Sequence, residues 1–300
     1  MSAHKATKIE LISQLFWQME IGADESLFET PCFKEKKIRL KEYFLLLENS
    51  NNSELRTKNV PKDSLLFKEL DQGFDLRKPK IDNSGPDLNE KKELEGINSL
   101  KELKLALESF EGISLKNTAT NLVFSDGNPD AKIMIVGEAP GKEEDKIGVP
   151  FVGQAGQLLD RMLKSVGLSR DQTYITNIIP WRPPGNRTPS QEEISLLKPF
   201  MLKHIQLKKP EIILALGGVS AKAILDVQTG ILKLRGKIQY KNFGLEKPTP
   251  VVPTLHPAYL LRAPAQKKFA FADLVLLKRC ILSNETSNKQ TNTATPYTIY

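Results

Sequence analysis

The chain has 300 residues, of which 40% are hydrophobic and 26% are charged, so it can bury a sizeable core and lacks the composition of a disordered protein. Lys and Arg exceed Asp and Glu by seven, and residues 1–100 carry a net charge of −2 while residues 101–300 carry +9. A basic C-terminal two-thirds indicates a polyanionic partner, with nucleic acid as the first candidate.

Cysteine and histidine are scarce, which restricts metal chemistry and location. The chain has two cysteines, Cys32 and Cys280, and three histidines, His4, His204 and His256. None of them has a spacing typical of zinc or iron–sulfur ligands, so the sequence predicts no bound metal. Isolated cysteines fit a reducing compartment, and no apolar run has the length of a signal peptide or membrane span. We therefore expect a cytoplasmic protein without a membrane anchor. We also expect a monomer.

The first third of the chain predicts two helices and then a polar stretch. Apolar side chains recur at helical spacing in residues 8–20 and 38–48, and this spacing returns in residues 95–110. The segment between lacks periodicity, as is typical of a linker, and the threonine-rich C-terminus is typical of a disordered tail. The expected organisation is a helical N-terminal element (1–48), a flexible linker (49–94), the main domain (95–282) and a disordered tail (283–300).

Within the main domain, short β-branched runs alternate with helical stretches. The predicted strands are 132–137, 173–177, 211–217 and 250–255, and the predicted helices are 153–166, 190–207, 218–226 and 264–281. Near-continuous apolar strands that alternate with helices are typical of a parallel sheet covered on both faces. Functional groups of such sheets gather where strands end, and a polar motif follows three of the four strands.

The first strand leads into a turn rich in Gly and Pro, with four carboxylates within residues 138–145. A phosphate-binding loop is not favoured, because three residues instead of four separate its glycines and Glu143 follows Lys142. The carboxylates suit positioning a water or stabilising positive charge on a sugar. Phe151 taken alone predicts a core residue, but the glycines and proline around it favour a loop aromatic that stacks on a planar base.

The second and fourth strands also end at polar residues. Asn177 closes the second strand, where its amide could read donor and acceptor positions of a base. Arg182 and Arg187 flank the following Pro-Pro-Gly turn and are natural phosphate contacts, although such turns also occur for structural reasons. A lone histidine is more often structural, but His256 follows the fourth strand directly and is a candidate for the site. His204, on an amphipathic helix, predicts a surface or packing role.

Three segments together resemble the family 4 uracil-DNA glycosylases: GEAPGKEEDKIGVPFVGQAGQLLD, YITNIIPWRPPGNRTPSQEE and PTLHPAYLLR. The resemblance covers about residues 105–281, with the motifs in the right order and spacing. It implies a three-layer α/β/α sandwich with a central four-stranded parallel sheet, to which this chain adds the helical N-terminal extension. It also implies an enzyme that cleaves uracil from DNA, with uracil-containing DNA as its partner.

The same resemblance implies roles for individual residues. For catalysis it implies Glu138, which would hold the attacking water, Glu144 as a second acidic position and His256 facing uracil O2; which glutamate activates water stays open. The implied uracil-binding residues are Ala139 (through its backbone amide), Phe151 (under the base), Asn177 (at its edge) and Asn186 (in support). The expected DNA-binding residues are Arg182, Arg187, Pro257, Tyr259 and Arg262.

The sequence departs from the family at one feature. Typical members hold a four-iron, four-sulfur cluster through four cysteines, and alignment places Phe110, Ile113, Trp181 and Leu197 at those positions. None of these side chains can ligate iron, and their packing could replace the cluster. The expectation is a branch with no cofactor. A related branch cross-links to DNA through a histidine in a loop inserted after the second strand, and this chain has neither the insertion nor the histidine.

The expected function is therefore a DNA repair glycosylase that hydrolyses the N-glycosidic bond of deaminated bases, chiefly uracil, and leaves an abasic site. Two alternatives stay open. One is a glycosylase whose specificity has shifted to hypoxanthine or xanthine, and the other is a non-catalytic protein that binds uracil in DNA. An assay of base release distinguishes them, whereas a binding assay alone does not.

Overall fold

The computed structural model of the protein describes residue 94 and residues 96–292. The predicted N-terminal element and all but the last residue of the predicted linker lie outside these described residues. That last residue, Leu94, is buried and packs into the hydrophobic core, so the folded domain begins at or before it. Among the described residues, no helix has the length and hydropathy needed to cross a bilayer.

Six strands form a single sheet in the order β1-β3-β2-β4-β6-β5. The strands are β1 (Asp126–Gly127), β2 (Ile133–Gly137), β3 (Thr173–Asn177), β4 (Ile212–Leu216), β5 (Gln239–Lys241) and β6 (Thr249–Thr254). β3, β2, β4 and β6 are parallel neighbours, which confirms the predicted four-stranded parallel sheet. β1 and β5 add short antiparallel edges that the sequence analysis missed, because two or three residues are too few to show a strand period.

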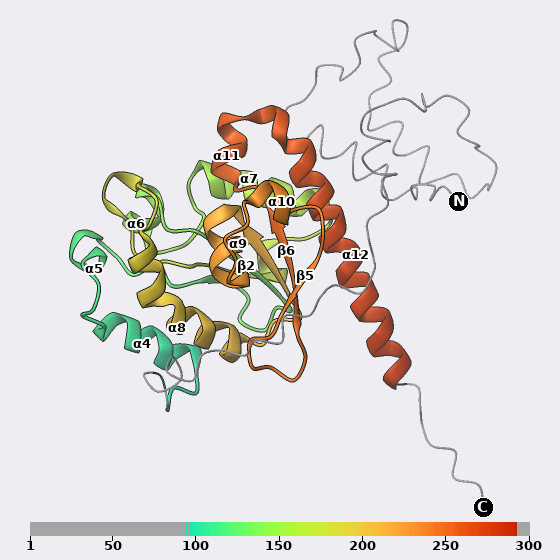
Figure 1. The fold of residues 1–300 in the computed structure, drawn as a ribbon, viewed down its shortest axis with the longest axis horizontal. Coiled ribbons are helices and arrows are strands. Elements are labelled where there is room, and N and C mark those ends of the chain that lie inside the picture. The colour runs from blue at the N-terminus through green and yellow to red at the C-terminus, as the bar shows by residue number, and fades with distance from the viewer. Residues whose placement is uncertain (1–93, 95, 293–300) are drawn as a thin grey trace, which may run out of the picture.

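The helices cover both faces of this sheet (Figure 1). They are α4 (Leu100–Ser109), α5 (Leu115–Thr118), α6 (Lys142–Ile147), α7 (Gln154–Ser165), α8 (Gln191–Lys208), α9 (Gly217–Leu225), α10 (Ile231–Leu234), α11 (Pro257–Arg262) and α12 (Lys267–Asn292). The helices predicted within residues 95–282 are confirmed, with one boundary to correct, whereas those predicted for residues 8–20 and 38–48 lie outside the described residues. α12 continues to Asn292, so the tail boundary predicted after residue 282 falls inside a helix; residues 293–300 lie outside the described part.

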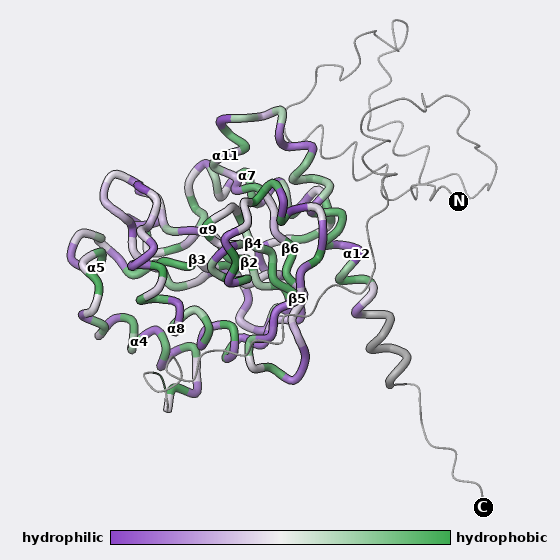
Figure 2. The backbone as a smooth tube through the Cα atoms, viewed as in Figure 1, coloured by the Kyte–Doolittle hydropathy of each residue, from purple (hydrophilic) through white to green (hydrophobic). Residues whose placement is uncertain are grey.

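Alternation along the strands divides the core into two clusters. In β2, Met134 and Val136 join a cluster with α4, α8 and α9, whereas Ile133 and Ile135 join one with α7, α11 and α12. Successive side chains of a strand point to opposite faces, so a strand that is apolar throughout needs helices on both sides. Figure 2 shows hydrophobic residues along the central strands. This arrangement confirms the three-layer α/β/α sandwich.

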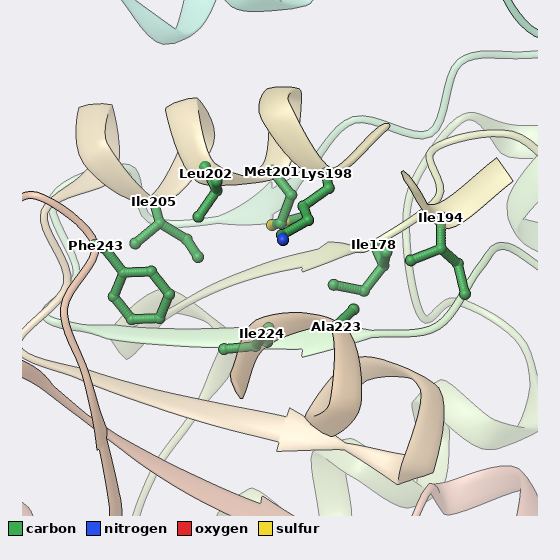
Figure 3. A pocket seen from close by; sticks show the side chains of 9 residues that line it. All are labelled: Ile178, Ile194, Lys198, Met201, Leu202, Ile205, Ala223, Ile224 and Phe243. Carbon is green, nitrogen blue, oxygen red and sulfur yellow. The ribbon is translucent and has the colours of Figure 1, made fainter. Parts of the chain in front are cut away.

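A small cavity lies on the α8 and α9 side of the sheet (Figure 3). Eight of its nine lining side chains are apolar, with Lys198 as the polar one; the others are Ile178, Ile194, Met201, Leu202, Ile205, Ala223, Ile224 and Phe243. A binding pocket normally presents several convergent polar groups. This cavity has one, so we interpret it as a packing gap within the α8-side core.

Candidate active site

Three loops meet at the carboxyl-terminal edge of the parallel strands. Glu138 follows β2 directly, Asn177 is the last residue of β3, and His256 comes two residues after β6. Phe151 enters from the loop between α6 and α7, and its ring centroid lies 5.8 Å from that of His256. Residues from three separate motifs are thus brought to the same edge, as expected for parallel strands.

Gly137 leaves open the space between Asn177 and Phe151. A Cβ atom at Gly137 would lie 2.3 Å from Asn177 Oδ1 and 2.5 Å from Phe151 Cζ, so the absence of a side chain there is a steric requirement. The Asn177 side chain is 3% exposed, and its Oδ1 has no hydrogen-bond partner among the described residues. A buried acceptor without a donor costs about 1–3 kcal/mol. This oxygen is therefore available to a donor supplied by a ligand.

Phe151 has a backbone conformation that fixes the direction of its ring. Its φ angle is 55°, in the left-handed region that disfavours L-residues by roughly 1–2 kcal/mol. The residue is 6% exposed and belongs to the α7-side hydrophobic cluster. It is thus a loop residue, as predicted, but it is packed into the core and not free. Its core contacts keep the ring beside Gly137 and His256.

His256 is held as a neutral imidazole. Its Nδ1 accepts a hydrogen bond from Ala258 N–H at 3.2 Å, at the start of α11. Burial lowers the pKa of His256 to about 4, with a further lowering from Arg262 and an opposing effect from Glu144. At neutral pH the ring therefore carries its proton on Nε2, because Nδ1 is the acceptor. That N–H is a donor without a net positive charge.

The two predicted catalytic glutamates have different environments. Glu144 is 9% exposed, and its carboxylate accepts hydrogen bonds from the N–H groups of Gly141 (3.1 Å), Val152 (3.0 Å) and Gly153 (2.8 Å). It thereby joins α6 to the segment after Phe151. The Glu138 carboxylate makes no hydrogen bond within the described residues, and burial raises its pKa above the ordinary value of 4.5. Of the two, Glu138 is the carboxylate with free acceptor capacity.

The polar side chains around the Pro-Pro-Gly turn are paired with nearby groups of the protein. Asn186 is exposed, and its Oδ1 accepts a hydrogen bond from Arg182 Nε at 2.6 Å. Arg187 forms a bidentate pair with Glu193 at 2.6 and 2.8 Å, beside the N-terminus of α8. Among the described residues, no hydrogen bond joins Asn186 to the buried Asn177 oxygen. The expected roles of these three residues in base or phosphate binding stay predictions.

Helix α11 follows His256, and several of its side chains are exposed to solvent. Pro257 is its first residue and is buried, while Tyr259 is 38% exposed. Leu261, which the sequence analysis did not single out, is 39% exposed, and Arg262 beside it is also exposed. The sequence of this short helix, in which apolar and polar residues are mixed, does not indicate whether a given leucine is exposed. The pattern of aromatic, apolar and basic groups fits a nucleic-acid surface, and the predicted DNA contacts on α11 stay predictions.

The four positions aligned with cluster ligands form part of the α8-side core. Ile113, Trp181 and Leu197 are 4%, 2% and 1% exposed, and the Phe110 ring packs edge-on against Phe200 with centroids 5.0 Å apart. These side chains do not fit an iron–sulfur cluster, because they offer carbon where thiolates are needed. Within the described residues, no three His, Cys, Asp or Glu side chains are grouped to hold a metal ion.

Ala139 completes the loop, half-buried directly after Glu138. A buried unpaired amide oxygen, an aromatic ring, a neutral imidazole donor and a free carboxylate thus lie around one edge of an α/β sandwich. Together these groups offer a stacking surface and hydrogen-bonding partners for a planar heterocycle, as the site of a base-binding enzyme would.

The chain belongs to the uracil DNA glycosylase superfamily, whose family model matches residues 124–277. It is 40% identical to a type-4 uracil-DNA glycosylase of Sulfurisphaera tokodaii, over 62% of this chain and 87% of that protein. It is 45% identical to the Thermotoga maritima type-4 enzyme (48% and 73% covered) and 38% identical to the Archaeoglobus fulgidus one (56% and 86% covered). These matches confirm the family predicted from the three motifs.

Proposed function

We propose that the protein hydrolyses the N-glycosidic bond of deaminated bases in DNA, chiefly uracil, and leaves an abasic site. The observation that carries the proposal is the unpaired Oδ1 of Asn177, which lies with the Phe151 ring against Gly137, while the same ring lies 5.8 Å from the ring of His256. The printed names of the type-4 relatives support uracil as the substrate. The basic character of residues 101–300 supports DNA as the polymer.

Recognition begins with extrusion of the base from the duplex, which costs roughly a few kcal/mol and less in a mismatch. The extruded uracil then lies against the Phe151 ring. Its N3–H donates to Asn177 Oδ1, which satisfies the acceptor that the free protein leaves unpaired. Cytosine is disfavoured because it lacks the N3–H donor and would leave the Asn177 oxygen unpaired.

Hydrolysis requires opposite charges at the two ends of the bond. As the bond between C1′ and N1 stretches, its electron pair moves to uracil, and the sugar becomes positively charged. His256 Nε2–H donates to uracil O2, where the negative charge accumulates. Glu138 takes the proton of the water that attacks C1′, so the water oxygen bonds to C1′ while uracil leaves as an anion. Glu144 contributes by holding the loop that carries Phe151.

The experiment that tests this proposal is release of free base from oligonucleotides. We expect the purified protein to release uracil from U:G, U:A and single-stranded DNA and to leave alkali-labile abasic sites. Parallel substrates that contain hypoxanthine or xanthine test the alternative specificity. DNA that is retained by the protein but stays intact would favour the non-catalytic alternative, and release of hypoxanthine without uracil would favour the shifted one.

We also propose that packing among Phe110, Ile113, Trp181 and Leu197 replaces the cluster of typical relatives. The purified protein should be colourless, with no stoichiometric iron, because these side chains offer no thiolate. Elemental analysis of protein purified without oxygen checks this, since anaerobic work prevents oxidative loss of a cluster. One equivalent of four iron atoms per chain would mean that other residues bind a cluster.

A further inference from the structure

Arg170 contacts the loop that carries Phe151, and it lies outside the three sequence motifs. It begins the short 3-10 helix Arg170–Gln172 that precedes β3. Its Nη2 donates to the Phe151 carbonyl oxygen, and its Nη1 lies 3.3 Å from the Pro150 carbonyl oxygen. One guanidinium group thus contacts both peptide carbonyls that flank the φ bond of Phe151.

Two carboxylates hold this guanidinium in place. Its Nε donates to Asp160 Oδ1 on α7 at 2.8 Å, and its Nη1 donates to Asp126 on β1. The Arg170 side chain is 26% exposed, so part of each interaction is shielded from solvent. A planar guanidinium with partners on three elements has little freedom to turn.

The Phe151 backbone needs external support, because its φ of 55° is disfavoured for a phenylalanine. The peptide group that joins Phe151 to Val152 is contacted at both of its polar atoms. At its carbonyl, a Cβ at Gly156 would lie 1.8 Å from the Phe151 oxygen, so α7 packs directly against this group. At its N–H, Val152 donates to Glu144. Arg170 supplies the charged donor for the carbonyl itself.

We propose that Arg170 is a positioning residue that holds Phe151 in its left-handed conformation and so aims the ring at the base pocket. Without the guanidinium, the Phe151 carbonyl would lose its donor, and the loop would relax toward negative φ. Rotation about this bond would move the ring away from Gly137 and His256. The inference rests on the proposed function, because it assigns the ring to base stacking.

A double-mutant cycle between Arg170 and Phe151 tests whether the arginine acts through the ring. We expect Arg170→Ala to slow single-turnover uracil release on the order of 10- to 100-fold, since a displacement of about 1 Å can cost this much. Arg170→Lys should restore only part of the rate, because an ammonium cannot reproduce the fork. In a Phe151→Ala background, Arg170→Ala should change the rate less than about twofold. Arg279→Ala, exposed on α12, is the matched control for loss of one arginine.

Amide hydrogen exchange of residues 148–156 in DNA-free protein gives a second readout that needs no activity. We expect faster exchange in this segment for Arg170→Ala and unchanged exchange in β2 and β4. Unchanged exchange with a wild-type rate, or losses that multiply in the double variant, would overturn the inference. A wild-type protein that released no base would refute the proposed function, and the exchange measurement would still decide whether Arg170 holds the loop.

Discussion

Replacing Asn177 by alanine should slow uracil release by roughly 100-fold or more while the protein stays folded, by analogy with loss of one preorganised hydrogen-bonding group. The side chain is buried and its Oδ1 has no partner within the described residues, so its deletion removes no hydrogen bond from the free protein. The free energy of unfolding should therefore change little or increase, since a buried unpaired acceptor costs about 1–3 kcal/mol. Single-turnover kinetics and thermal unfolding of the same preparations measure both effects.

Asn177→Asp probes the same atom more sharply. A carboxylate can accept from the exocyclic amine of cytosine, and in its protonated form it can also donate to cytosine N3. We expect this variant to gain weak cytosine release and to lose most uracil release. The measurement is product analysis on matched oligonucleotides that carry either cytosine or uracil at one position.

Asn128→Asp is the control for this change of charge. Asn128 lies in the turn before β2, at the opposite end of the strand from the site, and its Oδ1 accepts from Asp130 N–H at 2.9 Å. Aspartate keeps this acceptor, so the variant should excise uracil at the wild-type rate. Wild-type uracil release by both Asn177 variants would remove Asn177 from the pocket.

The parallel sheet could be predicted because each strand carries its own signal. β2, β3, β4 and β6 are buried along their whole length, so their sequences are apolar or β-branched without a polar alternation. β1 and β5 carry no such signal. They exist because Asp126 and Gly127 pair with β3 and because Gln239–Lys241 pairs with β6, and a pairing partner is not visible in a local window.

The end of α12 shows the limit of composition as a guide. The segment SNETSNKQTN is polar, and its composition predicts a tail, but the helix continues to Asn292. Polar residues are compatible with a helix that has already formed, since elongation is far easier than nucleation. The helix starts in the apolar stretch from Lys267 and therefore extends farther than the local polarity predicts.

The role of His204 also could not be decided from the sequence pattern. The helical pattern left a surface or packing role open, and the structure places the ring 3% exposed, stacked on Phe124 with centroids 4.6 Å apart. Tyr174 hydroxyl lies 2.8 Å from its Nε2. Burial, with a smaller effect of Lys208, lowers the His204 pKa to about 3, so it is a neutral packing residue. Only the three-dimensional neighbours could decide this.

The sequence placed the candidate site residues in three motifs without dividing tasks among them. Sequence spacing put Glu138 and Glu144 in one motif without distinguishing them. The distinction depends on residues 152 and 153, whose N–H groups return to Glu144 after the turn. Loop closure of this kind has no periodic pattern, so the different environments of the two carboxylates are visible only in the structure.

Glu138→Gln should therefore abolish most base release without loss of stability. In the proposed mechanism this carboxylate accepts a proton from water, which an amide cannot do. Burial raises the Glu138 pKa in the folded state, so the charged form opposes folding at neutral pH. Removing that charge should leave the melting temperature at pH 7 equal to or above that of the wild type, as measured by calorimetry.

The pH dependence of the wild-type rate follows from the same carboxylate. The rate should fall as the pH is lowered through the raised pKa of Glu138, that is, at a pH above the ordinary 4.5 of a glutamate. His256, with a pKa of about 4, stays neutral over this range and adds no second step until the medium is more acidic. Single-turnover rates between about pH 4 and pH 9 measure the profile, and Glu138→Gln should remove the acidic limb.

Glu144→Gln is the matched comparison. It should lose stability and keep the acidic limb of the pH profile, the reverse of Glu138→Gln. Its carboxylate accepts from three backbone N–H groups, and a glutamine presents one oxygen and an NH₂ group to the same donors. At least one donor loses its acceptor, which should cost about 1.5–3 kcal/mol of unfolding free energy for a hydrogen bond to a charged group. Base release should fall with the loosened Phe151 loop and keep the acidic limb, because Glu138 still titrates. A stable but inactive Glu144→Gln beside an active Glu138→Gln would reverse the assignment.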